Sequence, residues 1–325
     1  MNSRQPPILF APKVSVLIPV YNGERHLSEC LESVLAQDYN DVEVLIANDG
    51  SSDGSQKIIE QFAARAPRIR WWKNPRNLGL TANANVCLRA AKGEFIKFVH
   101  QDDALLSPSA LHKMVSVLDE NPAVVLVSSQ PHLTGTKSQP LFFSKKSGRY
   151  DGKKTIIACF EKNNNLIGQP TLTLFRKSAA PRGFNERFTG HMDFEMWCHL
   201  LEQGDFFHLA EPLATWRVHQ NHQTARARKD GTADREAWLL MEIYFKKNWL
   251  RAAATDRLLF AQIYYLRKKY GVAAAGLTDK MMTQLTARRY AWQWLKHRAA
   301  RPFQQLARKF QRAGKFLAHQ SFCTF

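Results

Sequence analysis

The stretch "VSVLIPVYNGERHLSECLESVLAQ", residues 14–37, begins as an unbroken apolar run and continues as an amphipathic segment. Its first part, residues 14–20, has the length and composition of a strand that is buried on both faces. The apolar side chains that follow recur at intervals typical of one helix face: Leu27, Leu31, Val34 and Leu35. The stretch therefore predicts a buried strand followed by a helix that packs against it.

The same pattern repeats through the first 130 residues. Further short runs typical of strands occupy residues 42–47, 69–72, 95–99 and 123–129, with helical patterns between them. Strict alternation of strand and helix is typical of a parallel sheet with helices on both faces. After residue 130 a loop-rich stretch begins, a further helix is predicted around residues 192–201, and the chain is mostly helical after about residue 221.

The charge of the chain favours an anionic partner. Lys and Arg number 46 and Asp and Glu 28, which gives a formal net charge of +18. Nucleic acid, anionic lipid and phosphorylated substrates all fit this excess. The five cysteines form no CxxC pair, which argues against a zinc site or a disulfide framework and indicates a reducing cytoplasm. No run approaches the roughly 18 apolar residues that span a bilayer.

Polar and aromatic side chains follow three of the predicted strands directly. In open α/β sheets, ligands bind beyond the carboxyl ends of the strands, so these side chains are expected at one edge. The first strand is followed by Tyr21 and Asn22, the second by Asn48 and Asp49, and the fourth by His100, Gln101, Asp102 and Asp103. The sequence thus predicts an aromatic ring and three carboxylates at the carboxyl edge of the sheet.

The adjacent carboxylates Asp102 and Asp103 repel each other unless a cation neutralises them. Mg²⁺ and Mn²⁺ prefer such oxygen ligands and can bridge them to phosphates. The alternative is a solvated loop that caps the next helix, with Ser107 or Ser109 as partner. Neither a GxGxxG after the first strand nor a GxxxxGK[ST] occurs, which argues against a glycine-rich phosphate loop. A diphosphate held through a metal ion is the remaining common solution.

Three motifs carry a family resemblance: "VSVLIPVYNGERHLSECLESVLAQ", "VEVLIANDGSSDGS" and "NLGLTANANVCLRAAKGEFIKFVHQDD". In this order they resemble the successive motifs of the family 2 glycosyltransferases, over roughly residues 13–130. "MDFEMWCHLL" and "PLATWRVH" resemble the later, acceptor-side motifs more loosely. The resemblance implies the α/β GT-A fold, a Rossmann-like and mostly parallel sheet flanked by helices, here with a C-terminal helical extension.

The resemblance also implies a division of the chain and an activity. Residues 1–130 would form the nucleotide-sugar-binding half, residues 131–221 the acceptor-binding half, and residues 222–325 a basic helical region. The implied activity is an inverting, metal-dependent transfer of a sugar, by family habit from a UDP sugar, to an acceptor hydroxyl. Mn²⁺ or Mg²⁺ is the implied cofactor. Bacterial cell-surface polysaccharide or glycolipid synthesis is the implied setting.

Two departures from the family pattern keep an alternative open. His100 stands where relatives usually have a carboxylate, and Ala84 where they often have an arginine. The alternative is a catalytically inactive, glycosyltransferase-like protein that still binds a nucleotide. The retained acidic residues at the sheet edge argue against that alternative.

Site residues follow from the resemblance by position. Those of the nucleotide pocket are Pro19, Tyr21, Asn22, Asp49, Asp53, Asn85 and Asp102. Tyr21 is expected to stack on the base, and Asp49 to accept a hydrogen bond from the base edge. Asp53 alternatively caps the helix that follows it.

The metal ligands implied by the resemblance are Asp103, Asp102 and His219. Asp102 is shared with the pocket, because it faces either the ribose or the metal. His219 follows a predicted strand in the motif "RVH". His100 is either a further ligand or a bystander, since imidazole suits Mn²⁺ less well than carboxylate.

Asp193 is the implied catalytic base. A carboxylate suffices, because the acceptor hydroxyl loses its proton late in the reaction. Glu195 is the alternative, but at helical spacing it points to a different side.

The C-terminal segment predicts a basic amphipathic helix. An apolar stripe is formed by Phe303, Leu306, Phe310, Ala313 and Leu317, and basic residues populate the other faces. Such a helix is typical of proteins on the inner face of the cell membrane, and it favours a lipid-linked acceptor. The alternative is a helix packed on the catalytic domain. No nucleic-acid partner is expected, because no binding motif is recognisable.

Overall fold

The computed structural model describes residues 11–135, 144–218, 227 and 229–253. The chain divides into two compact units. The first comprises residues 1–159 and 164–245, and it contains the sheet and the candidate site. The second comprises residues 160–163 and 246–325, and its described part includes the short helix α9 (Asn248–Ala253).

The first unit is built on one sheet of eight strands. The strands are β1 (Val14–Val20), β2 (Val42–Asn48), β3 (Ile69–Lys73), β4 (Phe95–Phe98), β5 (Val124–Thr134), β6 (Gly148–Tyr150), β7 (Thr173–Arg176) and β8 (Asp205–Arg217). Their order across the sheet is β3-β2-β1-β4-β7-β5-β8-β6. Strands β1 to β4 are parallel to one another, whereas β7 pairs antiparallel with both β4 and β5.

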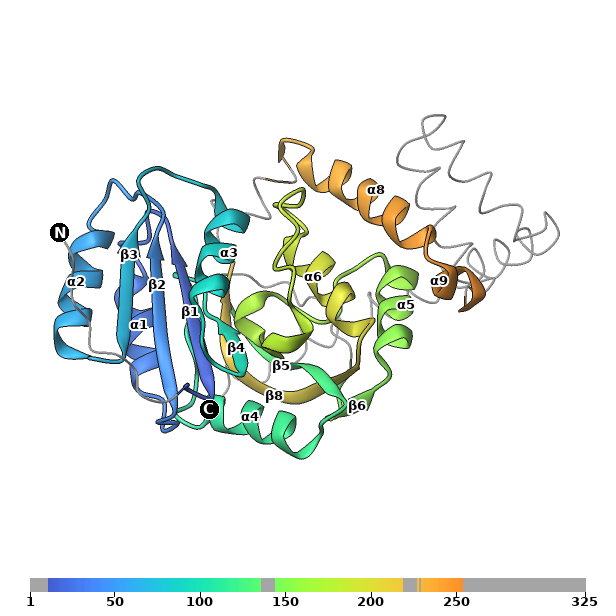
Figure 1. Ribbon diagram of the computed structural model, residues 1–325, viewed down its shortest axis with the longest axis horizontal. Coiled ribbons are helices and arrows are strands. Elements are labelled where there is room, and N and C mark those ends of the chain that lie inside the picture. The colour runs from blue at the N-terminus through green and yellow to red at the C-terminus, as the bar shows by residue number, and fades with distance from the viewer. Residues whose placement is uncertain (1–10, 136–143, 219–226, 228, 254–325) are drawn as a thin grey trace, which may run out of the picture. The chain divides into compact units, whose positions relative to one another are not determined.

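Helices connect most of these strands (Figure 1). They are α1 (Leu27–Leu35), α2 (Ser55–Arg65), α3 (Leu80–Ala90), α4 (Ala110–Glu120), α5 (Gly152–Lys162), α6 (Met192–Leu201) and α8 (Thr232–Phe245). Two short 3₁₀ turns, η1 (Pro170–Leu172) and η2 (Lys177–Ala179), flank β7. The predicted α/β fold with a mostly parallel sheet between helices is confirmed.

Alternation along β1 explains how the sheet is covered on both faces. One set of side chains, Val14, Val16, Ile18 and Val20, joins a core with apolar residues of α1, α2 and α4. Helix α3 packs against β1 and β2, and Figure 1 shows it across the sheet from α4. Both faces of β1 are therefore buried, which is why its sequence is apolar except for Ser15, whose hydroxyl donates to the buried Glu43.

The position of β7 differs from the sequence-based expectation. Strict alternation predicts a parallel sheet, but β7 lies between β4 and β5 and runs in the opposite direction. The chain reaches β7 only after a long excursion through β5, β6 and α5. The insertion brings η1, which directly precedes β7, beside the end of β4, and the candidate site depends on this contact.

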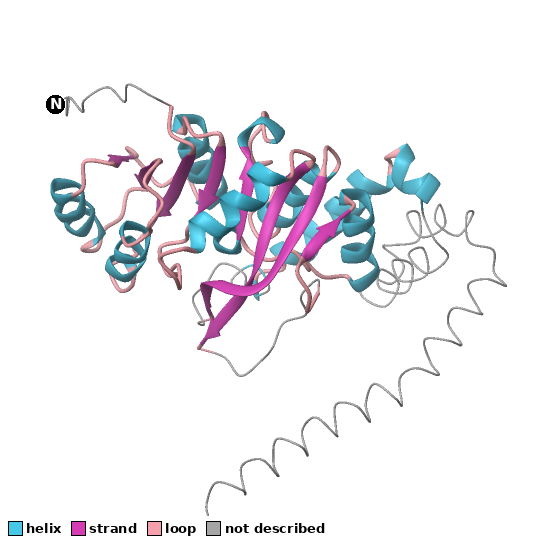
Figure 2. Ribbon diagram, turned by 90° about the horizontal axis from the view of Figure 1, so that it is seen from below, coloured by secondary structure: helices cyan, strands magenta, loops and turns pink. Residues whose placement is uncertain are grey.

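Strands β5 and β8 are long and parallel (Figure 2). Since β7 is antiparallel to both β4 and β5, strands β5 and β8 run in the same direction as β1 to β4. The end of β8 therefore reaches the same edge of the sheet as the end of β4. Among the described helices, none is both long enough and apolar enough to cross a bilayer.

Candidate active site

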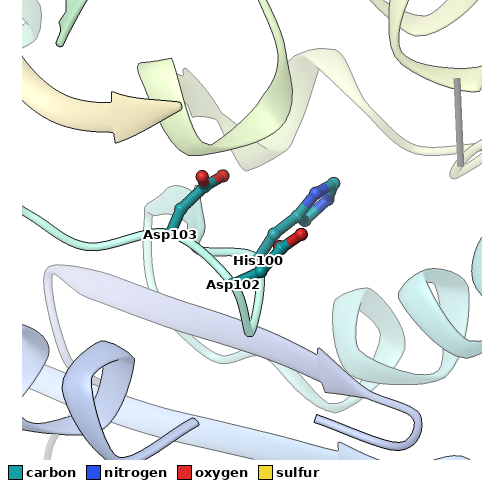
Figure 3. A group of neighbouring side chains, drawn as sticks. All are labelled: His100, Asp102 and Asp103. Atoms are coloured by element: carbon teal, nitrogen blue, oxygen red, sulfur yellow. The ribbon is translucent and has the colours of Figure 1, made fainter. Parts of the chain in front are cut away.

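A tight turn after β4 carries the cluster of His100, Asp102 and Asp103 (Figure 3). The amide of Asp103 donates to the carbonyl of His100 at 3.0 Å, which closes the turn. One ligand atom from each of the three side chains lies within 4.8 Å of the others. The predicted grouping of Asp102 and Asp103 at the sheet edge is thus present in the structure, with His100 beside them.

Asp103 is held in place by three hydrogen bonds. Its side chain is buried, at 3 % exposure. Oδ2 accepts hydrogen bonds from Gln169 Nε2 and Thr171 Oγ1, both at 2.8 Å, and Oδ1 accepts one from the Arg217 amide at 2.9 Å. A carboxylate oxygen has two acceptor positions, so Oδ1 keeps one position for a further partner.

The electrostatics of the turn suit a bound cation. Burial, together with the neighbouring Asp102, raises the pKa of Asp103 to about 7. Burial also lowers the pKa of His100, so the ring is neutral and keeps a nitrogen lone pair at neutral pH. A divalent cation stabilises the charged form of such carboxylates. The donor set, one imidazole and two carboxylates, fits a Mn²⁺ or Mg²⁺ ion.

Arg217, the last residue of β8, joins three elements at this turn. Its amide binds Asp103, and its Nε donates to the carbonyl of Asp102 at 2.9 Å. Its guanidinium also donates to both carboxylate oxygens of Glu29 on α1, at 2.9 and 2.8 Å. The turn is therefore fixed from β8 and from α1, which sequence reasoning did not foresee.

The predicted base-stacking residue, Tyr21, lies beside this turn. Its side chain is 45 % exposed, unusual for a large aromatic residue in this structure. The side-chain amide of Gln101 binds the Tyr21 backbone twice, accepting from its amide at 2.8 Å and donating to its carbonyl at 2.9 Å. The end of β1 is thus tied to the turn that carries Asp102 and Asp103.

Asn22 adopts a left-handed conformation, with φ of 50°. Its amide donates to Ser51 Oγ, and its side-chain oxygen accepts from the Ser52 amide. Pro19 lies near the end of β1, in register with Ala47 of β2. The ends of β1 and β2 therefore form one linked surface, although nucleotide contacts by Pro19 and Asn22 stay predictions.

Asp49 orders the loop after β3. Its carboxylate is buried and accepts hydrogen bonds from Asn74 Nδ2 at 2.8 Å, Leu78 N at 2.9 Å and Gly79 N at 3.0 Å. The first two bonds go to Oδ1 and the third to Oδ2, so Oδ2 keeps one acceptor position. The predicted bond to a base edge stays a prediction, and it would use that position.

Asp53 makes the contacts expected of a residue that caps the following helix, which is the alternative role predicted for it. One oxygen accepts from the Ser55 amide at the start of α2, and the other from the Glu24 amide, both at 3.0 Å. Burial opposes ionisation, but these hydrogen bonds outweigh it and lower the pKa of Asp53. The carboxylate is therefore charged and held between two loops, and its nucleotide contact stays a prediction.

Asn85 on α3 binds the loop that leads to α6. Its Nδ2 donates to the Phe184 carbonyl and to Glu186, each at 3.0 Å, and its Oδ1 accepts from the Phe184 amide at 2.7 Å. These bonds account for all the donors and for one acceptor position of the amide group. The predicted contact of Asn85 with the nucleotide stays untested, whereas its role in holding this loop is visible.

The predicted base, Asp193, lies in the first turn of α6. Its Oδ2 accepts a hydrogen bond from Asn165 Nδ2 at 3.2 Å. Burial raises the pKa of Asp193 to about 6, against the opposing effects of the Phe194 amide and the His191 charge. The rival candidate, Glu195, is buried and forms a two-fold ion pair with Arg182 at 2.9 Å. A raised pKa suits a general base better than a carboxylate held in an ion pair.

One loop, residues 165–171, contacts both Asp193 and Asp103. Asn165 binds Asp193 at its beginning, and Gln169 and Thr171 bind Asp103 at its end. In the middle, the Gly168 carbonyl accepts from Trp197 Nε1 at 2.8 Å, and Gly168 itself has φ of +112°. We call residues 165–171 the bridging loop. No sequence motif predicted the bonds of this loop to Asp103.

The segment before Asp193 is fixed by a buried glutamate of α8. Glu236 accepts from the Thr189 amide at 2.6 Å, the Thr189 hydroxyl at 2.9 Å, the Gly190 amide at 2.8 Å and the His191 amide at 2.7 Å. From α3, the Thr81 hydroxyl donates to the Phe188 carbonyl at 2.7 Å. The start of α6, and hence Asp193, is held from two helices.

We expect Glu236→Ala to lower the free energy of unfolding by about 2 kcal/mol or more, because three partly buried backbone amides lose their acceptor and a fully buried donor left unpaired costs about 1–3 kcal/mol. Burial opposes ionisation, yet the His191 ring and the Thr189 donors lower the pKa of Glu236. Its stabilisation is therefore present at neutral pH and is lost as the pH falls through that lowered pKa. Urea unfolding at pH 7 and in acid measures both effects.

The matched control for this variant is Glu242→Ala, which removes a partly exposed glutamate of the same helix. We expect it to change the free energy of unfolding by less than about 1 kcal/mol. Equal losses of unfolding free energy for the two variants would contradict the proposal that Glu236 fixes the segment before Asp193.

Two predictions lie outside the described residues. His219, an expected metal ligand, follows Arg217 by two positions and is not among them. The basic amphipathic helix predicted around residues 303–317 is not among them either.

Known proteins share both the sequence pattern and the fold. Residues 15–184 match the family model of Glycosyl transferase family 2. The chain belongs to this family. An uncharacterized glycosyltransferase of Rickettsia typhi is 30 % identical over 223 residues, which cover 67 % of this chain and 68 % of the relative. The resemblance inferred from the motifs is thus confirmed.

A relative with a specific name extends this picture. The GalNAc(5)-diNAcBac-PP-undecaprenol beta-1,3-glucosyltransferase of Campylobacter jejuni is 28 % identical over 201 residues, covering 60 % of this chain and 62 % of the relative.

Solved structures agree on the fold. TarS 1–349 of S. aureus in complex with UDP-GlcNAc superposes with a TM-score of 0.65 at 18 % identity, covering 85 % of this chain and 82 % of TarS. The mannosyltransferase PcManGT of Pyrobaculum calidifontis, in complex with GDP-Man and Mn²⁺, has a TM-score of 0.55 at 17 % identity and covers 89 % of this chain and 85 % of its own.

Proposed function

We propose that the protein is a metal-dependent, inverting glycosyltransferase that moves a sugar from a nucleoside diphosphate sugar, with UDP as the carrier, to an acceptor hydroxyl. The observation that carries the proposal is the cluster of His100, Asp102 and Asp103 at the carboxyl edge of the sheet. Structural relatives in complex with UDP-GlcNAc, and with GDP-Man and Mn²⁺, support a donor of this class. The setting is the synthesis of a bacterial cell-surface polysaccharide or glycolipid.

The donor nucleotide would bind at the ends of β1 and β2. Tyr21 offers an exposed ring on which the base stacks. Asp49 Oδ2 accepts a hydrogen bond from the base edge with its remaining acceptor position. Asp102 binds the ribose, the cation or both. Pro19, Asn22, Asp53 and Asn85 complete the proposed pocket by direct contact or by holding its walls.

Asp103 and Asp102 would hold the cation, with His219 as a further ligand beyond the described residues. When bound, Mn²⁺ or Mg²⁺ neutralises the negative charge of the diphosphate leaving group. Asp103 supplies the free position on Oδ1, since Gln169 and Thr171 already occupy Oδ2. Rigid hydrogen bonds to a ligand of this kind keep its lone pair aimed at one point.

Asp193 would act as the general base in a single displacement. The acceptor oxygen forms a bond to the anomeric carbon while the bond from that carbon to the diphosphate oxygen breaks. The acceptor proton passes to the Asp193 carboxylate, and the nucleoside diphosphate leaves with the electron pair. One displacement inverts the anomeric configuration, and no covalent enzyme intermediate is formed. A pKa of about 6 keeps Asp193 ionised at neutral pH yet basic enough to take the proton.

Thermal unfolding with nucleotides, followed by donor turnover, tests the proposal. We expect UDP with Mn²⁺ to stabilise the protein, by about 2.7 kcal/mol at a hundredfold excess over Kd, and EDTA to remove most of the effect. UDP sugars should then be consumed, with inversion detected by NMR of the product anomer. Stabilisation by GDP or dTDP instead of UDP would mean that the donor sugar is carried by that nucleotide. Metal-dependent binding without turnover of any sugar nucleotide, tested with a panel of acceptors, would favour the inactive binding protein.

The acceptor, we further expect, is carbohydrate that is linked to lipid at an anionic membrane surface. The PP-undecaprenol in the name of the Campylobacter jejuni relative supports this acceptor class. The net charge of +18 and the basic residues around 303–317 support the surface.

Replacing four basic residues of that segment, Arg308, Lys309, Arg312 and Lys315, by Gln should weaken binding to vesicles with anionic lipid at least tenfold. Each basic residue near such a surface contributes about 1 kcal/mol. Co-sedimentation with vesicles of phosphatidylglycerol, and with phosphatidylcholine as control, measures the change. Unchanged binding to anionic vesicles would favour a helix that packs on the domain.

A further inference from the structure

A lysine lies where the sheet is otherwise apolar. Lys97 is the third of four residues in β4, and its side chain is 0 % exposed. Its Nζ donates to the carbonyls of Thr171 and, at 3.1 Å, Thr173, and it lies 3.8 Å from Met114 Sδ. Within the described part of the chain, Lys97 forms no ion pair.

Burial makes this lysine costly to keep. Removing an ammonium group from water carries a penalty of several kcal/mol, even after the surroundings relax. Burial accordingly lowers the pKa of Lys97 to about 7, and the charge of Asp103 opposes that shift. An apolar side chain would satisfy the packing of a central strand without this penalty. The reason for a lysine is therefore to be sought in the two carbonyls that it binds.

Those carbonyls belong to the turn η1 and the first residue of β7. The same turn carries the side chains that orient Asp103. Thr171 donates from Oγ1 to Asp103 Oδ2 and accepts from the His100 amide at 3.0 Å, and Gln169 donates to the same Oδ2. Lys97 thus binds the backbone of the residue whose side chain binds both ends of the turn after β4.

We infer that Lys97 is a positioning residue for the cation site. It holds η1 against β4, so that Thr171 and Gln169 occupy Oδ2 of Asp103 and leave the free position on Oδ1 facing the ligand. The chain of contacts runs from Lys97 Nζ to the Thr171 carbonyl, and from the Thr171 hydroxyl to Asp103. This inference rests on the proposed function, in which Asp103 binds the cation.

The test is Mn²⁺ affinity, measured by the EPR signal of free Mn²⁺ during titration of the folded protein. We expect Lys97→Met, which keeps the length of the side chain, to raise the Kd for Mn²⁺ about tenfold, because residues that orient metal ligands typically contribute 10–100-fold. Thr171→Val should have a similar effect, since it removes only the hydroxyl. If the two residues act in series, the double variant should bind Mn²⁺ no more weakly than the weaker single variant.

Lys177→Met is the matched control. Lys177 also donates to a backbone carbonyl, that of Ala91, but it lies at the opposite end of β4, where its amide binds the Glu94 carbonyl. Losing that bond should lower stability without changing the Kd for Mn²⁺.

A second conservative variant, Thr171→Ser, separates orientation from folding because it restores the hydroxyl, and it should bind Mn²⁺ like the unaltered protein. Unchanged Mn²⁺ affinity in Thr171→Val overturns the inference even if Lys97→Met does not fold. The inference is also overturned if the two substitutions weaken Mn²⁺ binding additively in the double variant, or if Lys177→Met weakens Mn²⁺ binding equally. If the unaltered protein binds no Mn²⁺ or Mg²⁺, the proposed metal site fails and this inference fails with it. If the unaltered protein binds Mn²⁺ and the Lys97 and Thr171 variants bind it with the same Kd, only the inference about Lys97 is overturned.

Discussion

Replacing Asp103 by Asn is expected to lower kcat/KM for the sugar nucleotide about a thousandfold. The Asp103 carboxylate accepts three hydrogen bonds that hold it in place as a ligand, and an amide carries no charge to hold the cation. A metal ion that neutralises a leaving diphosphate contributes several kcal/mol to the transition state, and about 4 kcal/mol corresponds to a thousandfold change in rate. Steady-state kinetics at saturating Mn²⁺ measure this loss.

The same variant should also lose the stabilisation that Mn²⁺ gives the unaltered protein. The pKa of Asp103 in the folded chain, about 7, lies above its ordinary value of 3.8. The folded state therefore binds this proton more tightly, and the contribution of Asp103 to stability is lost as the pH rises from 3.8 through about 7 and then levels off. A bound cation offsets this loss, so Mn²⁺ should raise the unfolding temperature more at pH 8 than at pH 6. Asp103→Asn should show neither effect.

Asp119→Asn serves as the control for charge removal. Asp119 forms an ion pair with Lys13 at 2.8 Å. Lys13 directly precedes β1, so this ion pair lies at the edge of the sheet opposite to the candidate site. Its replacement should leave kcat/KM within about threefold. A similar loss in both variants would indicate that net charge, and not a ligand at Asp103, controls the activity.

Asp193→Asn is expected to lower kcat by a factor of about 10² to 10⁴, the usual contribution of a general base, with the Kd for the nucleotide unchanged. The isosteric amide keeps the hydrogen bond with Asn165 after rotation of the group but cannot accept the acceptor proton. Burial raises the pKa of Asp193 to about 6, so kcat of the unaltered protein should rise with pH and level off above about 7. That rise should disappear in the variant.

Glu195→Gln decides between the two acidic residues of α6. It breaks the ion pair with Arg182 and leaves a guanidinium without its buried partner. We expect a lower unfolding temperature but a kcat within about threefold at a temperature where both proteins are folded. The opposite result, a large loss of kcat in Glu195→Gln and little in Asp193→Asn, would exchange their roles.

Much of the fold could be predicted because the burial of β1 and its neighbouring strands determines their amino-acid composition. Apart from Ser15, the residues from Val14 to Val20 are apolar on both sides of the strand because helices cover both faces of the sheet. The position of β7 could not be predicted in this way. Its pairing between β4 and β5 is a contact between segments far apart in the chain, and a four-residue strand leaves no periodic signal.

The candidate site likewise contains residues that could be predicted from the sequence and residues that could not. Asp102, Asp103 and Tyr21 were predictable because they follow strands that end at one edge. Gln169 and Thr171 bind Asp103 only because β7 returns beside β4, so their contacts were hidden from any local pattern. Lys97 is a signal that could have been used, because a lysine within "FIKFV" is unusual in a strand that is buried on both faces, but the pattern of residues 95–99 predicts only a strand.

The bridging loop sets a rule for anyone who wishes to redesign the acceptor preference of this enzyme. It binds Asp193 at one end and Asp103 at the other, so the number of its residues sets the spacing between the proposed general base and the proposed cation ligand. Asn165, Gln169 and Thr171 have to be kept because their side chains bind the two carboxylates, and an insertion or deletion would move those carboxylates relative to each other. Grafts that change the length belong elsewhere, at segments such as the connection between β5 and β6, whose flanking residues contact neither carboxylate.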